Sequence, residues 1–427
     1  MNAPQLHKAV LILGLAAGLG LFAFVFHATR GDPHDLKWTA TKDVVQLGTD
    51  PSPGAIPTDL RVALFDRNRP NGVSYAMAYL GDNKVATWKL ETSKINGRLM
   101  DYRRLPSGRV VSFVLSGSTY FLCDFPEKPG LQPTCRAIPH LDGHDLVELP
   151  DRGMYLMFYM PRTDAGSLFE RRLVDLVIRR YDRDWKAVWE WSSREHISLN
   201  EYVANAPPEG LYAMAHGWVQ LSLGWLLHQF GVEHQVKIPF MSATTKPFKF
   251  DYIHGNSMAL DTDGGIIVSA RDTNSVFKID VGSGTIAWRL GGYQAKRSDF
   301  QMVGDALGGF SRQHSAIPLA GGNLLIFDNG DMRPDKHSRA VEYRLDFTKR
   351  EAHLVWEYRA GEAYRFRPTM GSVQRLKDGT TVIGWGTSSS LIPQTEPLAT
   401  AVDPTGRVLW KLSSPNGLYS YRVWVSD

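Results

Sequence analysis

Cysteine is scarce in this chain of 427 residues, which contains only Cys123 and Cys135. No further Cys or His pair lies at a zinc-like spacing, which argues against a structural zinc site. The net charge is also low, at +4. Since the chain shows no basic stripe with interleaved aromatic residues, we expect no nucleic-acid partner. We predict neither a bound metal nor a cofactor.

Charge is missing from one long stretch near the N-terminus. Residues 9–26 form an uncharged apolar run of 18 residues, which suits a membrane-spanning helix better than the core of a signal peptide. No convincing A-x-A cleavage site follows, so we predict an uncleaved anchor over residues 1–30, with a cleaved signal as the alternative. Residues 31–57 are rich in Pro, Asp, Thr and Gly, and we interpret them as a linker.

The two cysteines lie in the Pro- and Gly-rich segment FLCDFPEKPGLQPTC, between two strand-like pieces. Two cysteines that close one short loop favour a disulfide in an oxidising compartment, with two free thiols as the alternative. The anchor and the disulfide together predict that the main domain lies outside the cytoplasm. We expect a single-pass protein of the inner (cytoplasmic) membrane with its main domain on the periplasmic side.

Two sequence patterns recur from about residue 61. A Leu-x-x-Gly or similar turn precedes β-like runs at 105, 149, 260, 319 and 376, and β-like runs end in Trp at 88, 189, 288, 356 and 410. A repeat of this kind is typical of radial or solenoid architecture, and the β content favours a propeller. We therefore predict an all-β fold, a six-bladed β-propeller over residues 58–427. A pair of β-sandwiches is the structural alternative.

Residues 192–248 interrupt the repeat. The stretch around residues 209–230 is apolar and aromatic and has helical character, but it contains His216, Gln220 and His228. These polar groups disfavour a second membrane span. We predict a partly helical insertion, which could cover the propeller face as a lid, lie on the membrane surface or pack on the outside of the barrel.

Two units in residues 251–330 are built alike. Each begins with a polar cluster that contains a histidine, His254 in HGNS and His314 in RQHSA. A Gly turn and a strand follow, at Ile266–Ser269 and Leu324–Phe327, and a second polar cluster closes each unit. Polar residues just outside buried strands cost stability unless they have partners or a use. These clusters are the first indication of a functional site.

The order of motifs resembles the bacterial and fungal arylsulfotransferase family. The motifs are DxxHxNS, SAR, KID, GxIxWRLGG, FSRQH, FDNG, SRA, EYRLD, GSVQRLxxG and IGWG. The resemblance is strong over residues 251–390, is weaker over 60–190, and does not cover 192–248. It implies a six-bladed propeller that moves a sulfuryl group from one phenol to another without 3′-phosphoadenylyl sulfate. The reaction implied is ping-pong, through a sulfated histidine.

The resemblance also implies roles for individual residues. His314 would be the nucleophile, and His254, Asn256 and Arg271 would bind the sulfuryl oxygens. His144 in LDGHDL would be the fourth catalytic member besides His314, His254 and Arg271, and Thr387 is a looser match for a substrate-binding residue. His254 or His144 could also protonate the departing phenolate. The chain departs from the family pattern at Ser315, where an acid is expected after the nucleophile.

The partners implied are an aryl sulfate donor, a phenolic acceptor and, through the N-terminal helix, a membrane. A homodimer is compatible with the sequence. Two other functions stay open at this point: a non-catalytic propeller that serves as a binding or scaffold module, and an aryl-sulfate hydrolase in which water replaces the acceptor.

Overall fold

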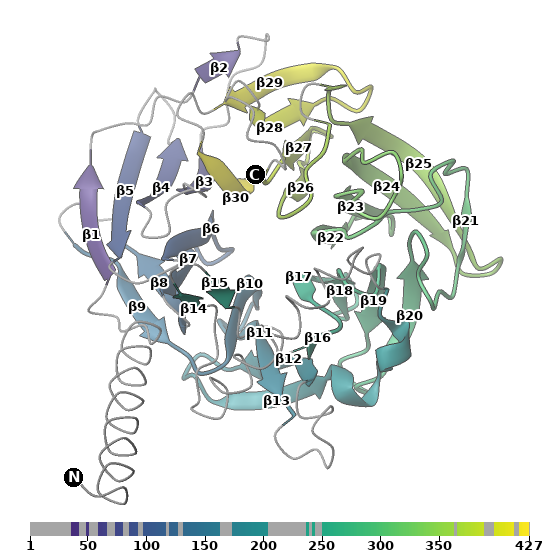
Figure 1. Ribbon diagram of the computed structural model, residues 1–427, viewed down its shortest axis with the longest axis horizontal. Helices are drawn as coiled ribbons and strands as arrows, with labels where there is room; N and C mark the ends of the chain where they lie inside the picture. Colours follow the sequence, from purple (N-terminus) through teal and green to yellow (C-terminus); the bar gives the residue numbers. More distant parts are fainter. Residues whose placement is uncertain are drawn as a thin grey trace, which may run out of the picture.

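Six β-sheets surround one axis in a computed structural model of the chain, and the residues that the structure describes form an all-β, six-bladed propeller with almost no helix (Figure 1). The structure describes residues 36–41, 48–50, 59–65, 73–79, 85–92, 97–116, 119–126, 131–162, 173–203, 236–238, 241–243, 250–362, 365–387, 397–413 and 418–426. The predicted fold class is confirmed, and the sandwich alternative is wrong.

The first three blades come from the N-terminal half of the chain, apart from one strand of blade 1 and the short strand β16 of blade 3. From the innermost strand to the outermost, blade 1 contains β30 (Tyr419–Val425), β3 (Leu60–Phe65), β4 (Ser74–Tyr79), β5 (Val85–Thr92) and β1 (Leu36–Thr41). In the same order, blade 2 contains β6 (Arg98–Arg104), β7 (Val110–Ser116), β8 (Thr119–Phe125) and β9 (Thr134–Ala137). Blade 3 contains β10 (Leu141–Glu148), β11 (Met154–Pro161), β12 (Leu173–Tyr181) and β13 (Ala187–Ser192), and β16 (Phe250–Asp251) pairs in parallel with β12.

The other three blades continue in chain order. Blade 4 contains β17 (Gly255–Leu260), β18 (Ile266–Ala270), β19 (Ser275–Ile279) and β20 (Ile286–Gly291). Blade 5 contains β22 (Ser315–Pro318), β23 (Leu324–Asp328), β24 (Arg339–Asp346), β25 (Glu351–Arg359) and β21 (Gln301–Val303). Blade 6 contains β26 (Ser372–Arg375), β27 (Thr381–Gly384), β28 (Pro397–Val402), β29 (Val408–Ser413) and β2 (Gly48–Asp50).

The Leu-x-x-Gly pattern joins the first and second strands of blades 2 to 6. In blade 2 the amide of Leu105 donates to the carbonyl of Arg109, and the amide of Gly108 donates back to the carbonyl of Leu105. The glycine of this turn has a φ of 88°, a left-handed value that costs glycine little. Blade 3 places Arg152 at the same position, with a φ of 68°. The repeated turn therefore marks the inner hairpin of a blade.

The tryptophan pattern marks the other side of the blade. Trp189, Trp288, Trp356 and Trp410 lie on the outermost or next-to-outermost strands of blades 3 to 6, and Trp88 lies on β5 of blade 1. Between the sheets, apolar residues of adjacent blades pack into common clusters, as Phe113 of blade 2 does with Leu156 of blade 3. Full burial of one such side chain stabilises the fold by about 1.5–3 kcal/mol.

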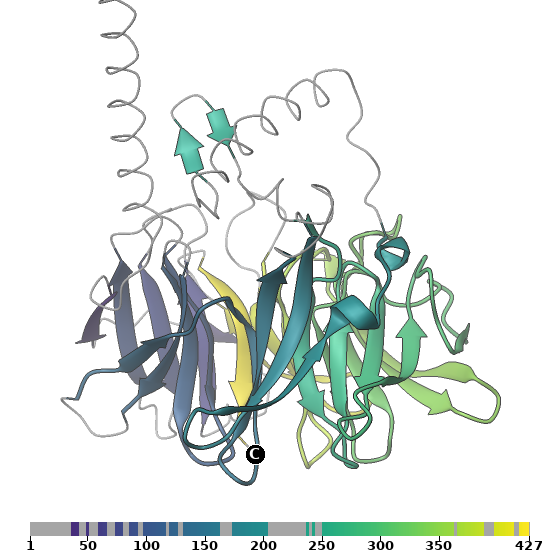
Figure 2. The ribbon, with the colours of Figure 1, turned by 90° about the horizontal axis from the view of Figure 1, so that it is seen from below.

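The ring is closed by the last strand of the chain. β30 pairs in antiparallel fashion with β3 and forms the innermost strand of blade 1, so the C-terminal strand joins a sheet otherwise made from the N-terminal part of the propeller (Figure 1). The six innermost strands β30, β6, β10, β17, β22 and β26 therefore surround the axis and run along it (Figure 2).

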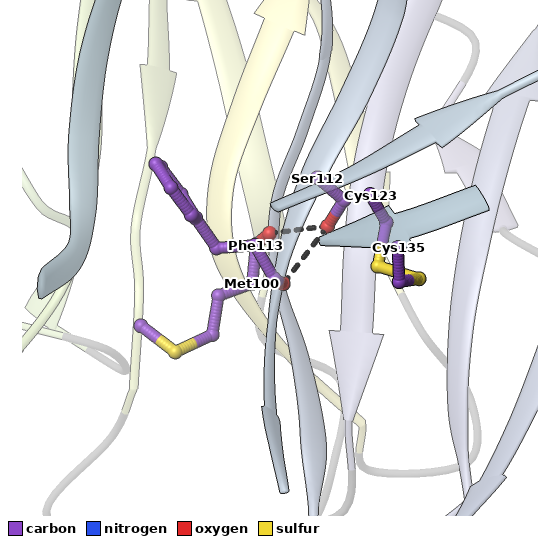
Figure 3. The surroundings of a disulfide bond; sticks show 5 residues. All are labelled: Met100, Ser112, Phe113, Cys123 and Cys135. Atoms are coloured by element: carbon purple, nitrogen blue, oxygen red, sulfur yellow. Dashed lines mark hydrogen bonds between the residues drawn. A yellow bond between two sulfur atoms is a disulfide. The ribbon is translucent and has the colours of Figure 1, made fainter. Parts of the chain in front are cut away.

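Cys123 and Cys135 form a disulfide in blade 2. They lie directly opposite each other on β8 and β9, with their sulfur atoms 2.06 Å apart (Figure 3). On the neighbouring strand, the Ser112 hydroxyl donates to backbone carbonyls, that of Phe113 being 3.0 Å away. This disulfide agrees with the sequence-based prediction, which favoured a disulfide over two free thiols.

Part of the predicted linker belongs to the propeller. Within residues 31–57, β1 pairs with β5 at the edge of blade 1 and β2 pairs with β29 at the edge of blade 6. β1 is an edge strand and buries fully only Leu36 of its six residues, so its sequence shows little of the alternation that reveals a half-buried strand. Edge strands of this kind are difficult to recognise from sequence.

The predicted helical elements are not found in the described residues. Within 192–248 the structure shows two short 3-10 turns, Ser193–Glu195 and Leu199–Glu201, and a hairpin of β14 (Val236–Ile238) and β15 (Met241–Ala243) beyond one end of the blades (Figure 2). The helix expected around 209–230 and the apolar run 9–26 lie outside the described residues. Within the described ranges, no helix is long and apolar enough to cross a membrane.

Candidate active site

Three histidines from three blades meet near the propeller axis. His144 lies on β10, and His254 and His314 directly precede β17 and β22, so each is carried by an innermost strand or its approach. The ring centroids of His144 and His254 are 4.8 Å apart, and those of His144 and His314 are 6.1 Å apart. The structure therefore brings together the three histidines that the sequence selected.

The imidazole of His314 is held in one orientation by a backbone carbonyl. Its Nδ1 lies 2.9 Å from the carbonyl oxygen of Gly371, the residue before β26. A carbonyl oxygen can only accept a hydrogen bond, so Nδ1 carries the proton and Nε2 carries the lone pair in the neutral ring. The backbone amide of His314 donates to the carbonyl of Phe327 at 3.1 Å. The ring is thus set with Nε2 available as a nucleophile.

The charge state of His314 follows from its surroundings. Burial lowers the pKa of His314 well below the ordinary value of 6.5, and the positive charge of Arg422 and the neighbouring His144 lower it further. The hydrogen bond to Gly371 opposes this shift but is outweighed. His314 is therefore neutral at physiological pH, as a nucleophilic imidazole must be.

The other two histidines differ from His314 because each binds a carboxylate through Nδ1. Nδ1 of His254 lies 2.8 Å from Oδ2 of Asp251, and Nδ1 of His144 contacts Asp142. Burial lowers the pKa of His144 although Asp142 opposes the shift. Burial acts to raise the pKa of Asp251, but the hydrogen bonds from His254 outweigh it and lower the pKa. Asp251 is therefore ionised, and its carboxylate fixes the orientation of the His254 ring through Nδ1.

Local backbone geometry produces these pairs. The pairing of β10 with β11 shifts register between Asp142 and Leu146, and this bulge includes His144. Bulges of this kind re-aim side chains. His254 has a φ of 49°, and its amide donates to Oδ1 of Asp251 at 2.7 Å. The left-handed residue and the capping carboxylate fix the histidine just before its strand begins.

Arg271 and Asn256 lie beside the histidines but have partners within the protein. The backbone amide of Arg271 donates to the carbonyl of His254 at 3.0 Å, while its guanidinium lies 2.8 Å from Asp272 and 3.6 Å from Asp331. The buried Asn256 amide donates to the carbonyl of Gln313 at 2.8 Å. Asn256 thus supports Gln313, the residue that precedes His314.

Thr387 is connected to the segment that orients His314. Its hydroxyl bonds the hydroxyl of Thr369, and its amide donates to the Thr369 carbonyl at 3.2 Å. Thr369 lies two residues before Gly371. The contacts of Thr387 therefore support this segment, and none of them joins it to the three histidines within the described residues.

Three neighbours of His314 were not identified from the sequence as site residues. Gly371 supplies the orienting carbonyl, and its position opens the motif GSVQRL, so a signal for it was present. Tyr421 packs its ring against that of His314 with centroids 5.2 Å apart and planes at 85°. Arg422 contributes positive charge. Both of these lie on the closing strand β30, outside every recognised motif.

Ser315, where the family pattern predicts an acid, is buried on β22 opposite Phe327. The imidazole of His314 is oriented by Gly371 and not by the residue that follows it. The departure at Ser315 therefore does not remove the contact that orients His314.

One group of residues could hold a metal ion among the residues that the structure describes. Asp346, Glu351 and His353 place one ligand atom each within 4.8 Å of one another at the end of the β24–β25 hairpin. Nε2 of His353 already lies 2.9 Å from Glu351, and Asp346 accepts hydrogen bonds from the turn amides of Thr348 and Lys349. These partners explain the group without a metal, and we assign none.

Comparison with known proteins gives this site a family. The family model of the arylsulfotransferases (ASST) matches residues 134–422, from the end of blade 2 to the closing strand. The chain belongs to the arylsulfotransferase family. The match includes His144, His254 and His314, as well as Gly371 and Arg422.

Among curated members of this family, the arylsulfate sulfotransferase AssT of Escherichia coli O6:H1 is 36% identical over 94 residues, which are 20% of this chain and 16% of that protein. The arylsulfate sulfotransferase AssT of Lelliottia amnigena is 33% identical over 94 residues, with the same coverage. The aligned part thus spans less than a fifth of either relative.

Solved structures resemble this arylsulfotransferase-family chain more distantly. A protein of unknown function from Bacteroides caccae has a TM-score of 0.49 and 10% identity, covering 86% of this chain and 98% of that chain. Virginiamycin B lyase from Staphylococcus aureus has a TM-score of 0.38 and 10% identity, covering 86% of this chain and 99% of that chain.

Proposed function

We propose that the chain is an aryl-sulfate sulfotransferase that moves a sulfuryl group from an aryl sulfate to a phenol through a sulfated His314. One observation carries this proposal: a neutral histidine with its Nδ1–H bound to a carbonyl lies in a cluster with two histidines that are bound to carboxylates. A neutral ring suits a nucleophile, and a carboxylate-supported ring suits a proton donor.

In the first half-reaction, Nε2 of His314 attacks the sulfur atom and the bond from sulfur to the aryl oxygen breaks. The electron pair of that bond leaves with the phenolic oxygen, which takes a proton from Nε2 of His254. The sulfuryl group is then bonded to Nε2 of His314, and the Nδ1–H of the ring keeps its bond to Gly371. This order of events needs His314 to be unprotonated when the donor arrives.

In the second half-reaction, the hydroxyl of the acceptor phenol attacks sulfur and gives its proton to His254. The bond between sulfur and Nε2 breaks, and its electron pair returns to His314. His254 is then protonated again, and the site has regained its starting state. Atoms and charge balance over the cycle without an added cofactor.

His254 suits the acid role better than His144. The side chain of His254 is 27% exposed, against 12% for His144, and it is paired with the ionised Asp251. Burial lowers the pKa of His144, which disfavours the protonated form needed to donate. We assign His144 to the packing of the histidine cluster and to contact with the sulfuryl group.

Arg271, Asn256 and Thr387 complete the proposed site. Sulfuryl transfer resembles phosphoryl transfer, in which negative charge gathers on the oxygens of the transferred group. Cations and hydrogen-bond donors around these oxygens therefore lower the barrier. Arg271, partly exposed next to His254, is proposed to bind the oxygens, whereas Asn256 and Thr387 are proposed to support the segments that surround them.

The location of the enzyme is also proposed. The apolar run at residues 9–26 would anchor the chain in the inner membrane, and the propeller, including its edge strands β1 and β2, would form the catalytic domain on the periplasmic side. The pairing of Cys123 with Cys135 supports an oxidising compartment. Labelling of single introduced cysteines in intact cells, on an accessible loop of the propeller, would locate the domain.

The test of the activity is incubation of the purified chain with 4-nitrophenyl sulfate, with and without an added phenol. Phenolate release that rises with the acceptor, and a mass gain of one sulfuryl group that is lost in His314→Ala, are the expected results. Release without acceptor dependence would identify a hydrolase. A folded protein that gives neither release nor adduct with a panel of aryl sulfates would instead be a binding module.

A further inference from the structure

Arg422 is a buried cation next to the histidine cluster. It lies on the closing strand β30 and is only 1% exposed. One terminal nitrogen lies 3.0 Å from Oδ2 of Asp145, and the other donates to the carbonyl of Asn256 at 2.5 Å. The guanidinium is therefore held from two blades, and its charge is fixed in space.

Two short chains of contacts connect this cation with the nucleophile. Gly371, whose carbonyl binds Nδ1 of His314, donates its own amide to the carbonyl of Tyr421 at 3.1 Å. Asn256, whose carbonyl accepts from Arg422, donates its side-chain amide to Gln313, the residue before His314. The contacts that position His314, through Gly371 and through Asn256, thus both connect to residues of β30.

The charge of Arg422 belongs to a buried network. Asp145 accepts from Arg103 at 2.7 Å as well as from Arg422, and it also accepts from the backbone amides of Leu146 and Met258. Burial acts to raise the pKa of Asp145, but the two arginines outweigh burial and lower it. Asp145 is therefore ionised. Taking these charges out of water has a desolvation cost, so the network is weak evidence for a role in stability alone.

One donor of the cation, the buried Nε–H of Arg422, has no acceptor in the part of the chain that the structure describes. Buried donors are nearly always satisfied in native proteins, and an exception calls for an explanation. An anion bonded to His314 would supply a negative charge close to this guanidinium.

We propose that Arg422 is a positioning residue of the sulfuryl-transfer site, whose fixed positive charge favours the state in which His314 carries a sulfuryl group and not a proton. This inference depends on the proposed function. The groups that face His314 are His144 from β10, His254 from the approach to β17, and Tyr421 and Arg422 from β30. Asp145, Asp101 and Tyr421 face Arg422 in turn.

The test compares Arg422→Gln and Arg422→Lys with the wild type in the full chain, measuring kcat and the pH dependence of kcat/KM for 4-nitrophenyl sulfate. In Arg422→Gln we expect kcat to fall by about 10²-fold, as for the loss of one transition-state donor. We also expect the acid limb of kcat/KM to move to higher pH, because a cation that opposed protonation of His314 is gone. Arg422→Lys should restore the position of the acid limb and part of kcat.

Two further variants keep this test decisive. If Arg422→Gln does not fold because Asp145 has lost one of its two arginine partners, the double variant Arg422→Gln/Asp145→Asn removes both charges and should still show the shifted limb. Arg61→Gln is the matched control, since Arg61 is a buried arginine on β3 that pairs with Asp59 at 2.8 Å. It should leave the acid limb unchanged.

An acid limb that stays in place in both the single and the double Arg422 variants would overturn the inference. A wild-type chain with no sulfated adduct would instead overturn the proposed function itself, so the two failures can be told apart.

Discussion

Nδ1 of His314 donates to the carbonyl of Gly371 at 2.9 Å, across the boundary between blades 5 and 6. The glycine that provides this carbonyl has a φ of 101°. A Cβ added there would lie 2.3 Å from the ring of Phe327. The carbonyl of Phe327 in turn accepts a hydrogen bond from the backbone amide of His314. His314, its orienting carbonyl and the Phe327 ring therefore form one packed unit.

Gly371→Ala should therefore damage the site as well as the fold. The positive φ alone costs an alanine about 1–3 kcal/mol, and the collision with Phe327 must displace the carbonyl that orients His314. Because small misplacements of reacting groups are expensive, we expect kcat to fall by about 10²-fold. Gly108→Ala is the control: its φ is 88°, but nothing lies within 4 Å of an added Cβ, so kcat should be unchanged. Equal kcat values in the two variants would contradict this view.

Stability should fall as the pH is lowered below the ordinary histidine pKa of 6.5. His314 and His144 both have lowered pKa values in the folded state because they are buried. In the window between those lowered values and 6.5, the unfolded chain binds protons that the folded chain does not, so the free energy of unfolding increases with pH.

The slope in this window should be up to about 1.4 kcal/mol per pH unit for each histidine. Urea unfolding over this pH range measures it. His314→Gln should flatten the profile, whereas substitution of the exposed His140 should not. A wild-type profile that is flat or falls with rising pH would refute the assignment of a neutral, buried His314.

The features that could be predicted from the sequence are those encoded locally. Each Leu-x-x-Gly turn is closed by a hydrogen bond between residues four positions apart, as between Leu319 and Asn323, so blades 2 to 6 repeat the same signal. Tryptophan on the outer strands adds a second signal. Blade 2 is the exception, because its outer strand β9 carries Cys135 in place of tryptophan. His254 and His314 were found because both directly precede an inner strand within such a repeat.

The features that were missed depend on contacts between distant parts of the chain. β30 becomes an inner strand only by pairing with β3 at the other end of the propeller, and nothing local distinguishes it from an ordinary strand. Tyr421 and Arg422 were therefore not recognised as neighbours of His314. The carboxylate partners Asp142 and Asp251 lie two and three residues before their histidines, but their contacts depend on a bulge and on a left-handed residue.

Asp328 is predicted to be essential for the stability of blade 5. Its carboxylate is fully buried and binds Arg333 and Arg339, with Oδ2 2.5 Å and 2.9 Å from their nitrogens. Both arginine side chains are 1% exposed. Removing one partner of a buried ionic cluster costs up to about 3–5 kcal/mol, even though Arg333 keeps Asp335 and Arg339 keeps Asp305.

Thermal and urea unfolding of Asp328→Asn should show this loss, with the transition still cooperative. The control is Arg407→Gln, which breaks a solvent-exposed pair with Asp403 and should leave the midpoint nearly unchanged, since such pairs contribute little. Similar midpoints for the two variants would show that the Asp328 cluster is not stabilising.

Asp251→Asn should reveal which histidine protonates the departing phenol. In the proposed mechanism His254 carries a positive charge before it donates its proton, and the ionised Asp251 lies 2.8 Å from its Nδ1. Asparagine has no charge to balance that of the ring. In a ping-pong reaction, kcat/KM for the donor reports only the steps up to release of the first phenol. General acid catalysis matters most when the leaving oxygen is strongly basic. We therefore expect kcat/KM to fall by about 10²-fold with phenyl sulfate and by less than about 10-fold with 4-nitrophenyl sulfate.

The matched control for this prediction is Asp142→Asn, which removes the corresponding partner of His144. His144 is more buried than His254, and burial lowers its pKa, so its protonated form is scarce with or without Asp142. The Asp142 variant should therefore lose activity to a similar extent with both donors, because any change acts through the shape of the histidine cluster. If instead Asp142→Asn shows the dependence on leaving-group basicity and Asp251→Asn does not, the acid is His144, and the assignment of His254 is wrong. The ratio of kcat/KM for phenyl sulfate to kcat/KM for 4-nitrophenyl sulfate thus distinguishes a loss of proton donation from a loss of positioning. The rate with one donor alone cannot distinguish them.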